Sequence, residues 1–213
     1  LKVSYTLDTL PNGLTLIVHE DHSVPIVTTN VWFHVGSGDE KVGRTGFAHL
    51  FEHLMFEGSK NVPEGEMIKI LERHGLAFGA DTNAATSFDD TTYRLDLPKT
   101  DNETVDSSLH MLRDVAGELT IAQDAVDRER GVVLSEERAR DTPSYRIFTD
   151  RFSFLLKDQR PPMRLPIGKV EVLKSAPASA IRAYYEQWYR PERAVFVAAG
   201  AGAPSAGADP HRH

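Results

Sequence analysis

The stretch that decides the fold is TGFAHLFEHLMFEG, residues 45–58. Its apolar residues recur at helical spacing, and the glycine at its end is a typical helix stop. His49 and His53 are four residues apart, so on a helix their imidazoles point the same way. Glu52 lies beside them, away from the apolar stripe. The sequence therefore predicts a helix that buries one face and presents an H-x-x-E-H face.

That face has the residue types of a hydrolytic metal site. Two imidazoles can hold a cation while a neighbouring carboxylate acts on water, but a catalytic zinc site needs a third protein ligand. The chain has no cysteine, and the best candidates are Glu129 and Glu136, seven residues apart on one helical stripe with two valines. Carboxylates in an apolar stripe are costly to bury unless they are paired or bind metal. Without the H-x-x-E-H motif, both would be interpreted as surface carboxylates bridged by arginine.

The rest of the chain mixes β-rich runs and amphipathic helices without a strict β-α-β order. We expect strands at residues 14–18, 27–35, 77–85, 91–97 and 194–199, and helices at residues 45–57, 67–73, 103–119, 123–140, 146–156 and 179–189. This order predicts an α+β fold, with helices packed on one face of a largely antiparallel mixed sheet. We expect residues 1–199 to form one domain. Residues 200–213 are a low-complexity tail, disordered or left over from cloning.

The composition excludes several classes of protein. With 40% hydrophobic and 26% charged residues, the chain is not mainly disordered. No apolar run approaches the roughly 18 residues of a membrane span. The net charge of −7 argues against nucleic acid as the main partner. The charge is uneven, because residues 138–193 carry 12 Lys/Arg and 6 Asp/Glu; this region is either an ordinary solvated surface or a docking region for an acidic partner.

Several motifs, taken together and in order, resemble the N-terminal half of the M16 zinc metallopeptidases, the family of pitrilysin, insulysin and mitochondrial processing peptidase. The bacterial branch is the most similar. The resemblance runs from about residue 5 to residue 199, and it rests on LPNGL (10–14), VGSGDE (35–40), TGFAHLFEHLMFEG (45–58), NAAT (83–86) and the RER and SEER segments (128–130 and 135–138).

The resemblance implies a zinc endopeptidase domain with one Zn²⁺ ion. His49, His53 and Glu136 would be the ligands. Glu52 would be the general base that takes a proton from the attacking water, and Glu129 would orient the site. Glu129 remains an alternative third ligand, because it follows His53 by 76 positions, closer to the usual family spacing than the 83 positions to Glu136.

The resemblance also implies how substrate binds. Asn83 and Ala84 match an edge strand to which a peptide or unfolded polypeptide adds as a further strand through main-chain hydrogen bonds. Family members pair this domain with a second, similar domain on the same or another chain, so this chain would need such a partner for full activity. The resemblance also suggests a periplasmic location in a bacterium.

Three other functions compete with the peptidase. A non-catalytic scaffold subunit of the same family would bind a partner, but such subunits usually lack part of the motif, which is intact here. S-ribosylhomocysteine lyases share the H-x-x-E-H helix but use a cysteine ligand, which this chain does not have. A dinucleotide or P-loop enzyme is excluded, because the GSG turn at residues 36–38 lacks the third glycine and no Gly-Lys-Ser/Thr follows.

Overall fold

The computed structural model describes residues 3–201. In chain order its strands and helices are β1 (Thr6–Thr9), β2 (Thr15–Glu20), β3 (Val27–Phe33), α1 (Phe47–Leu54), α2 (Glu66–Arg73), β4 (Thr82–Thr86), β5 (Thr91–Leu97), α3 (Asn102–Gly117), α4 (Gln123–Arg140), α5 (Pro143–Leu155), α6 (Val170–Ser175), α7 (Ala178–Trp188) and β6 (Ala194–Gly200). Three short 3-10 turns connect some of them, at Ser37–Asp39, Pro161–Met163 and Pro191–Arg193.

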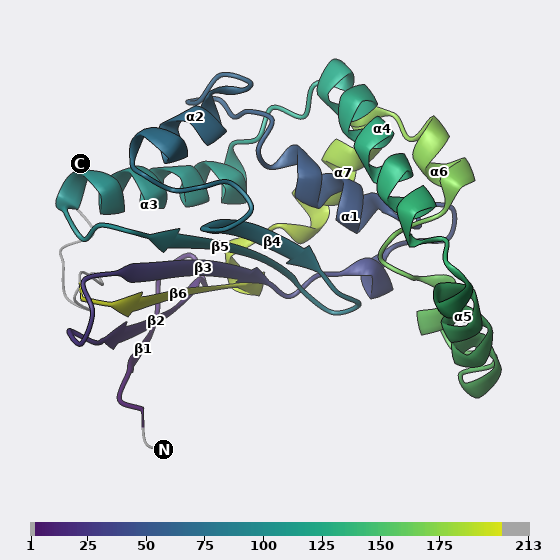
Figure 1. Ribbon diagram of the computed structural model, residues 1–213, viewed down its shortest axis with the longest axis horizontal. Helices are drawn as coiled ribbons and strands as arrows, with labels where there is room; N and C mark the ends of the chain where they lie inside the picture. The colour runs from purple at the N-terminus through teal and green to yellow at the C-terminus, as the bar shows by residue number, and fades with distance from the viewer. Residues whose placement is uncertain (1–2, 202–213) are drawn as a thin grey trace.

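A single mixed sheet with the order β1-β2-β6-β3-β5-β4 organises the fold. Strands β2 and β6 pair in parallel, and every other neighbouring pair in this sheet is antiparallel. The helices lie over one face of the sheet, and α5 projects beyond its end (Figure 1). The prediction of an α+β fold with a largely antiparallel sheet is confirmed.

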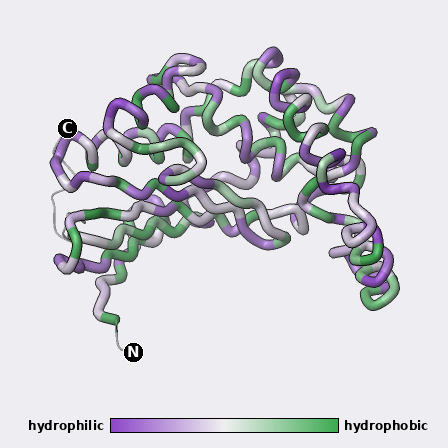
Figure 2. The backbone as a smooth tube through the Cα atoms, in the orientation of Figure 1, coloured by the Kyte–Doolittle hydropathy of each residue, from purple (hydrophilic) through white to green (hydrophobic). Residues whose placement is uncertain are grey.

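The core lies between this sheet and the helices. Along β3, buried and less buried residues alternate, as expected for a strand with one covered face. In the tube view hydrophobic and hydrophilic residues mix along both the strands and the helices (Figure 2). Leu50 and Phe51 of α1 are fully buried, and the Phe51 ring centroid lies 4.3 Å from that of Tyr189. Burying each such side chain contributes roughly 1.5–3 kcal/mol, so α1 is held firmly against the core.

The strand expected at residues 77–85 is shorter and later than predicted. β4 begins only at Thr82. The preceding residues form a turn in which the Asp81 carboxylate accepts a hydrogen bond from the Ala77 N–H at 2.8 Å. Gly79 adopts φ = +85°, a left-handed conformation that interrupts an extended strand. Because this stretch consists largely of apolar and small residues, its periodicity does not distinguish a turn from a strand.

Two elements of the structure, β1 and α6, were not predicted, because neither has a clear periodic pattern in the sequence. β1 has four residues, all exposed, and α6 has six residues, too few to establish a helical pattern. β6 extends to Gly200, and residues 202–213, the rest of the expected tail, lie outside the described residues. Within residues 3–201, no helix combines the length and apolarity that crossing a membrane requires.

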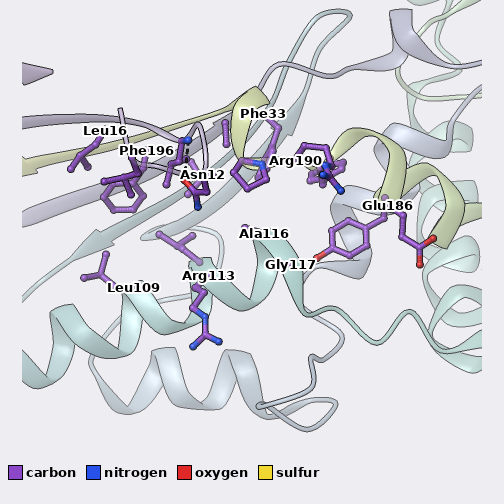
Figure 3. Close-up of a pocket in the computed structure, with 18 residues that line it drawn as sticks. Asn12, Leu16, Phe33, Leu109, Arg113, Ala116, Gly117, Glu186, Arg190 and Phe196 are labelled. Atoms are coloured by element: carbon purple, nitrogen blue, oxygen red, sulfur yellow. Dashed lines mark hydrogen bonds between the residues drawn. The ribbon is translucent and has the colours of Figure 1, made fainter. Parts of the chain in front are cut away.

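An apolar groove of about 650 Å³ opens between the sheet and helices α3 and α7 (Figure 3). Leu16, Phe33 and Phe196 contribute to its sheet side and Leu109 to its helix side. Among residues 3–201, its lining contains no histidine and one carboxylate, that of Glu186. This groove therefore lacks the groups for hydrolysis, which gather elsewhere.

Candidate active site

The N-terminus of α1 is fixed by a buried carboxylate. Glu40 Oε1 accepts hydrogen bonds from the N–H groups of Gly46 and Ala48, at 3.0 and 2.9 Å. Arg164 Nε donates to the Glu40 carbonyl oxygen at 3.0 Å. Gly46 has φ = +108°, and a Cβ there would lie 2.8 Å from the Cα of Gly168. These contacts set where α1 begins and hence where its histidines lie.

Glu40 makes the stability of this region depend on pH. Burial raises the pKa of Glu40 to about 8, although the N–H groups that it accepts from and the Arg164 guanidinium oppose the rise. The Tyr184 hydroxyl donates to the Gly36 carbonyl, and the charges of Glu40 and Asp39 contribute to the raised pKa of Tyr184. A folded-state pKa above the unfolded value of about 4.5 means that the folded protein binds the proton more tightly. Protonated Glu40 therefore stabilises the folded protein fully below the unfolded-state pKa of about 4.5, and this stabilisation is lost as the pH rises toward 8.

We expect the free energy of unfolding to fall between pH 6 and pH 9, by an amount on the order of 2–3 kcal/mol from Glu40. In Glu40→Gln this component should disappear, because an amide keeps an acceptor oxygen but cannot ionise. Urea unfolding of both proteins at the two pH values measures the difference, and groups common to both cancel. Equal pH dependence in the two proteins would contradict the assignment.

Helices α1 and α4 bring three potential ligands together. His49 and His53 lie one turn apart on α1, with ring centroids separated by 4.9 Å. Glu136, on α4, places Oε2 3.4 Å from His49 Nε2 and Oε1 3.5 Å from His53 Nε2. One ligand atom from each of the three residues lies within 4.8 Å of the others. The cluster expected from the sequence is thus assembled by the packing of two helices.

Glu129 has a different position from Glu136. Its Oε2 lies 3.0 Å from His53 Nδ1, behind the imidazole and away from the Nε2 atoms. Such a hydrogen bond fixes the tautomer and orientation of a metal-binding histidine. Among the described residues, neither carboxylate forms an ion pair with an arginine, so the arginine-bridged interpretation does not describe them.

The donor set fits a zinc ion. Ligand atoms bound tetrahedrally at about 2.0–2.1 Å are separated by about 3.4 Å. The Glu136 carboxylate places one oxygen 3.4 Å from His49 Nε2 and the other 3.5 Å from His53 Nε2. Two imidazoles and one carboxylate also leave a fourth coordination position open. Burial, followed by the proximity of His53, lowers the pKa of His49 to about 4. The His49 imidazole is therefore neutral at pH 7, the form that binds metal.

Glu52 lies beside the cluster in a shielded position, 9% exposed. Burial raises the pKa of its carboxyl, and the hydrogen bond that Thr86 donates to Oε2, at 2.5 Å, partly offsets the rise. Thr86 is the last residue of the NAAT segment, and the sequence alone predicts no role for it. Its position, where β4 ends opposite α1, is visible only in three dimensions.

A groove of about 440 Å³ passes along Glu52, His53, Glu129 and Glu136. β4 forms one side and contributes Asn83 and Ala84. Because β4 is the outermost strand of the sheet, one edge of its main chain has no neighbouring strand in the part of the chain that the structure describes. The two residues expected to meet substrate thus lie on an open edge beside the cluster.

His49 and His53 of α1 and Glu136 of α4 thus form one cluster beside a mixed sheet that helices cover. The chain belongs to the M16 peptidase family, because the family model "Insulinase (Peptidase family M16)" matches residues 15–153. This confirms the resemblance seen in the sequence motifs.

Individual relatives agree with this membership. The chain is 34% identical over 193 residues to "Probable zinc protease PqqL" of Escherichia coli K12, covering 90% of this chain and 21% of PqqL. It is 32% identical over 199 residues to "Zinc protease PqqE" of Helicobacter pylori, covering 90% of this chain and 42% of PqqE. The crystal structure of the first half of the periplasmic protease PqqL from Escherichia coli matches with a TM-score of 0.89 and 32% identity, covering 92% of this chain and 42% of that one. The chain therefore spans about a fifth to two fifths of the length of these relatives.

Proposed function

We propose that this chain is the catalytic domain of a zinc endopeptidase that hydrolyses peptide bonds in extended polypeptides. The observation that carries the proposal is the convergence of His49, His53 and Glu136 next to Glu52, in a groove bordered by an open sheet edge. A non-catalytic scaffold has no need of this complete set.

His49, His53 and Glu136 would hold the zinc ion, and Glu129 would keep the His53 ring oriented. When bound, zinc makes a water molecule more acidic and polarises the carbonyl of the peptide bond that is cut. The other tasks fall to side chains of this chain.

Glu52 would accept a proton from the attacking water and later deliver it to the departing amine. Its partial burial favours this role, because a carboxylate with a raised pKa is a stronger base than an exposed one. The hydroxyl of Thr86 holds one carboxylate oxygen, so the other is free to face water. Glu52 therefore takes up one proton from water and releases one proton to the new amino group, so it ends the reaction in its starting form.

Substrate would bind by adding a strand to β4 at Asn83 and Ala84. Main-chain pairing gives affinity with little dependence on side chains, which suits peptides or unfolded polypeptides as substrates. The proposal includes a second, similar domain or subunit that closes over the groove, because the relatives are longer than this chain. We also propose a periplasmic location, because the similar protease PqqL is periplasmic.

We expect the purified protein to contain about one zinc ion per chain and to cleave an unstructured peptide only when zinc is present. Because His211 and His213 could bind metal adventitiously, the measurement uses a variant with both replaced by alanine. Elemental mass spectrometry gives the metal content, and a quenched fluorescent peptide reports cleavage before chelation, after chelation and after zinc is returned. A protein that takes up no zinc would refute the catalytic assignment and favour the scaffold.

A further inference from the structure

Four aromatic rings form a row that leads away from the candidate active site. Tyr145, Phe148 and Phe152 repeat at helical spacing along one face of α5. Ring centroids are 6.1 Å apart for Tyr145 and Phe148 and 5.4 Å apart for Phe148 and Phe152, the latter pair stacked at 16°. The row ends at Phe88, 6.1 Å from Phe152. We call these four residues the aromatic row.

The row is open to solvent. α5 has no buried residue, and it projects from the rest of the domain (Figure 1). Phe148 is 50% exposed, and the other three rings are partly exposed. A contiguous apolar surface of this kind, with polar residues around it, is typical of a site that binds another molecule.

Cationic groups flank the row. Residues 138–160 contain six Lys/Arg and three Asp/Glu, whereas the whole chain has a net charge of −7. Arg140 is the last residue of α4, three positions before α5 begins, and Arg151 lies on α5 next in sequence to Phe152. Within residues 3–201, Arg140 and Arg151 form no ion pair. The surface therefore complements a segment that carries both apolar and acidic side chains.

The row also starts close to the end of β4. β4 ends at Thr86, and Phe88 follows two residues later, in the turn between β4 and β5. An added strand advances about 3.3 Å per residue, so a polypeptide paired with β4 and continuing past Thr86 reaches Phe88 within a few residues. From Phe88 the rings of α5 provide the next contacts.

We propose that the aromatic row is an extended binding site for the part of the substrate that continues beyond β4, and that it selects aromatic or apolar residues accompanied by acidic ones. This inference rests on the proposed function, and it specifies a class of substrate. It makes the domain favour long polypeptides over short peptides, because a short peptide fills the groove without reaching α5.

The test measures binding of two families of fluorescent peptides to the zinc-loaded Glu52→Gln protein, in which peptides stay intact. The short peptide has about eight residues; the long ones add about twelve residues containing Phe and Glu, on either the amino or the carboxyl side. We expect one of the long peptides to bind about tenfold more tightly than the short one. Phe148→Ala should remove that advantage and leave the short peptide unaffected.

Phe154→Ala is the matched control, because it removes the same side chain from the same helix. Phe154 is 81% exposed and points about 120° away from Phe148 around α5. Circular dichroism of both variants verifies that the fold is kept, as expected for residues that are not buried. The control should retain the preference for the long peptide.

The proposal is overturned if Phe148→Ala leaves the ratio of long-peptide to short-peptide affinity unchanged, or if Phe154→Ala lowers it equally. A partner domain that covers α5 would also overturn it, since Phe148→Ala would then weaken assembly of the protein rather than this ratio. Failure of the proposed function has a different signature, because the short peptide would then not bind the unmodified groove at all.

Discussion

Replacing Glu52 with glutamine is expected to abolish peptide cleavage while zinc remains bound. The amide has nearly the same shape and keeps an oxygen that can accept the Thr86 hydrogen bond, but it cannot take up a proton at neutral pH. General acid–base catalysis contributes about 10²–10⁴-fold, so kcat should fall by about that factor. Glu52 is not among the three clustered ligands, so metal content should stay unchanged. Steady-state cleavage and elemental mass spectrometry of the same sample give both quantities.

A matched substitution outside the groove separates this effect from a loss of charge. Glu66 is a partly exposed carboxylate on α2 that pairs with Lys69 and Arg73. Glu66→Gln removes one negative charge and should leave kcat within about twofold of the parent, as expected for a surface substitution. If Glu52→Gln cleaved at the parent rate, the proton-transfer role would be wrong even though the metal site could stand.

The parts of the fold that could be predicted from sequence are those specified locally. The helix predicted at residues 45–57 combines an apolar stripe with a glycine directly after it, and β5 and α4 have clear periodicity, so their bounds were close to those found. β4 was misjudged, because Gly79 bends the chain within a stretch that looks extended.

Features that depend on contacts between distant segments could not be predicted in the same way. Glu40 caps α1 from six residues before Gly46, and its burial in the folded protein raises its pKa. Phe88 meets Phe152 across 64 positions of sequence, so nothing local indicates an aromatic row. No pattern in the sequence indicates that Glu40 contacts the start of α1 or that Phe88 contacts Phe152.

The third ligand shows most clearly where sequence reasoning ends. Glu129 and Glu136 are seven residues apart and lie on the same stripe of α4, so periodicity treats them alike. Spacing along the chain favoured Glu129 and the local motif favoured Glu136. The crossing of α4 over α1 distinguishes them, because one carboxylate faces both Nε2 atoms and the other faces only Nδ1 of His53.

Glu136→Gln is therefore expected to weaken zinc binding far more than Glu129→Gln. An amide oxygen is a poor substitute for a carboxylate ligand, whereas loss of a hydrogen bond behind a ligating histidine costs about 10–100-fold in metal affinity. We expect Glu129→Gln to fall within that range and Glu136→Gln to exceed it. Competition with a chromogenic chelator measures both affinities, with His211 and His213 replaced by alanine in every protein.

Glu137→Gln is the control for this comparison, because Glu137 is the next residue on α4, is partly buried, and is absent from the ligand cluster. It should keep the parent affinity, which would exclude a general effect of removing a negative charge near the site. A larger loss from Glu129 than from Glu136 would contradict the geometry and make Glu129 the ligand. Equal losses would mean that both carboxylates bind the ion. The structure argues against that outcome, because the Glu129 carboxylate contacts His53 Nδ1 at 3.0 Å, on the side of the ring away from Nε2.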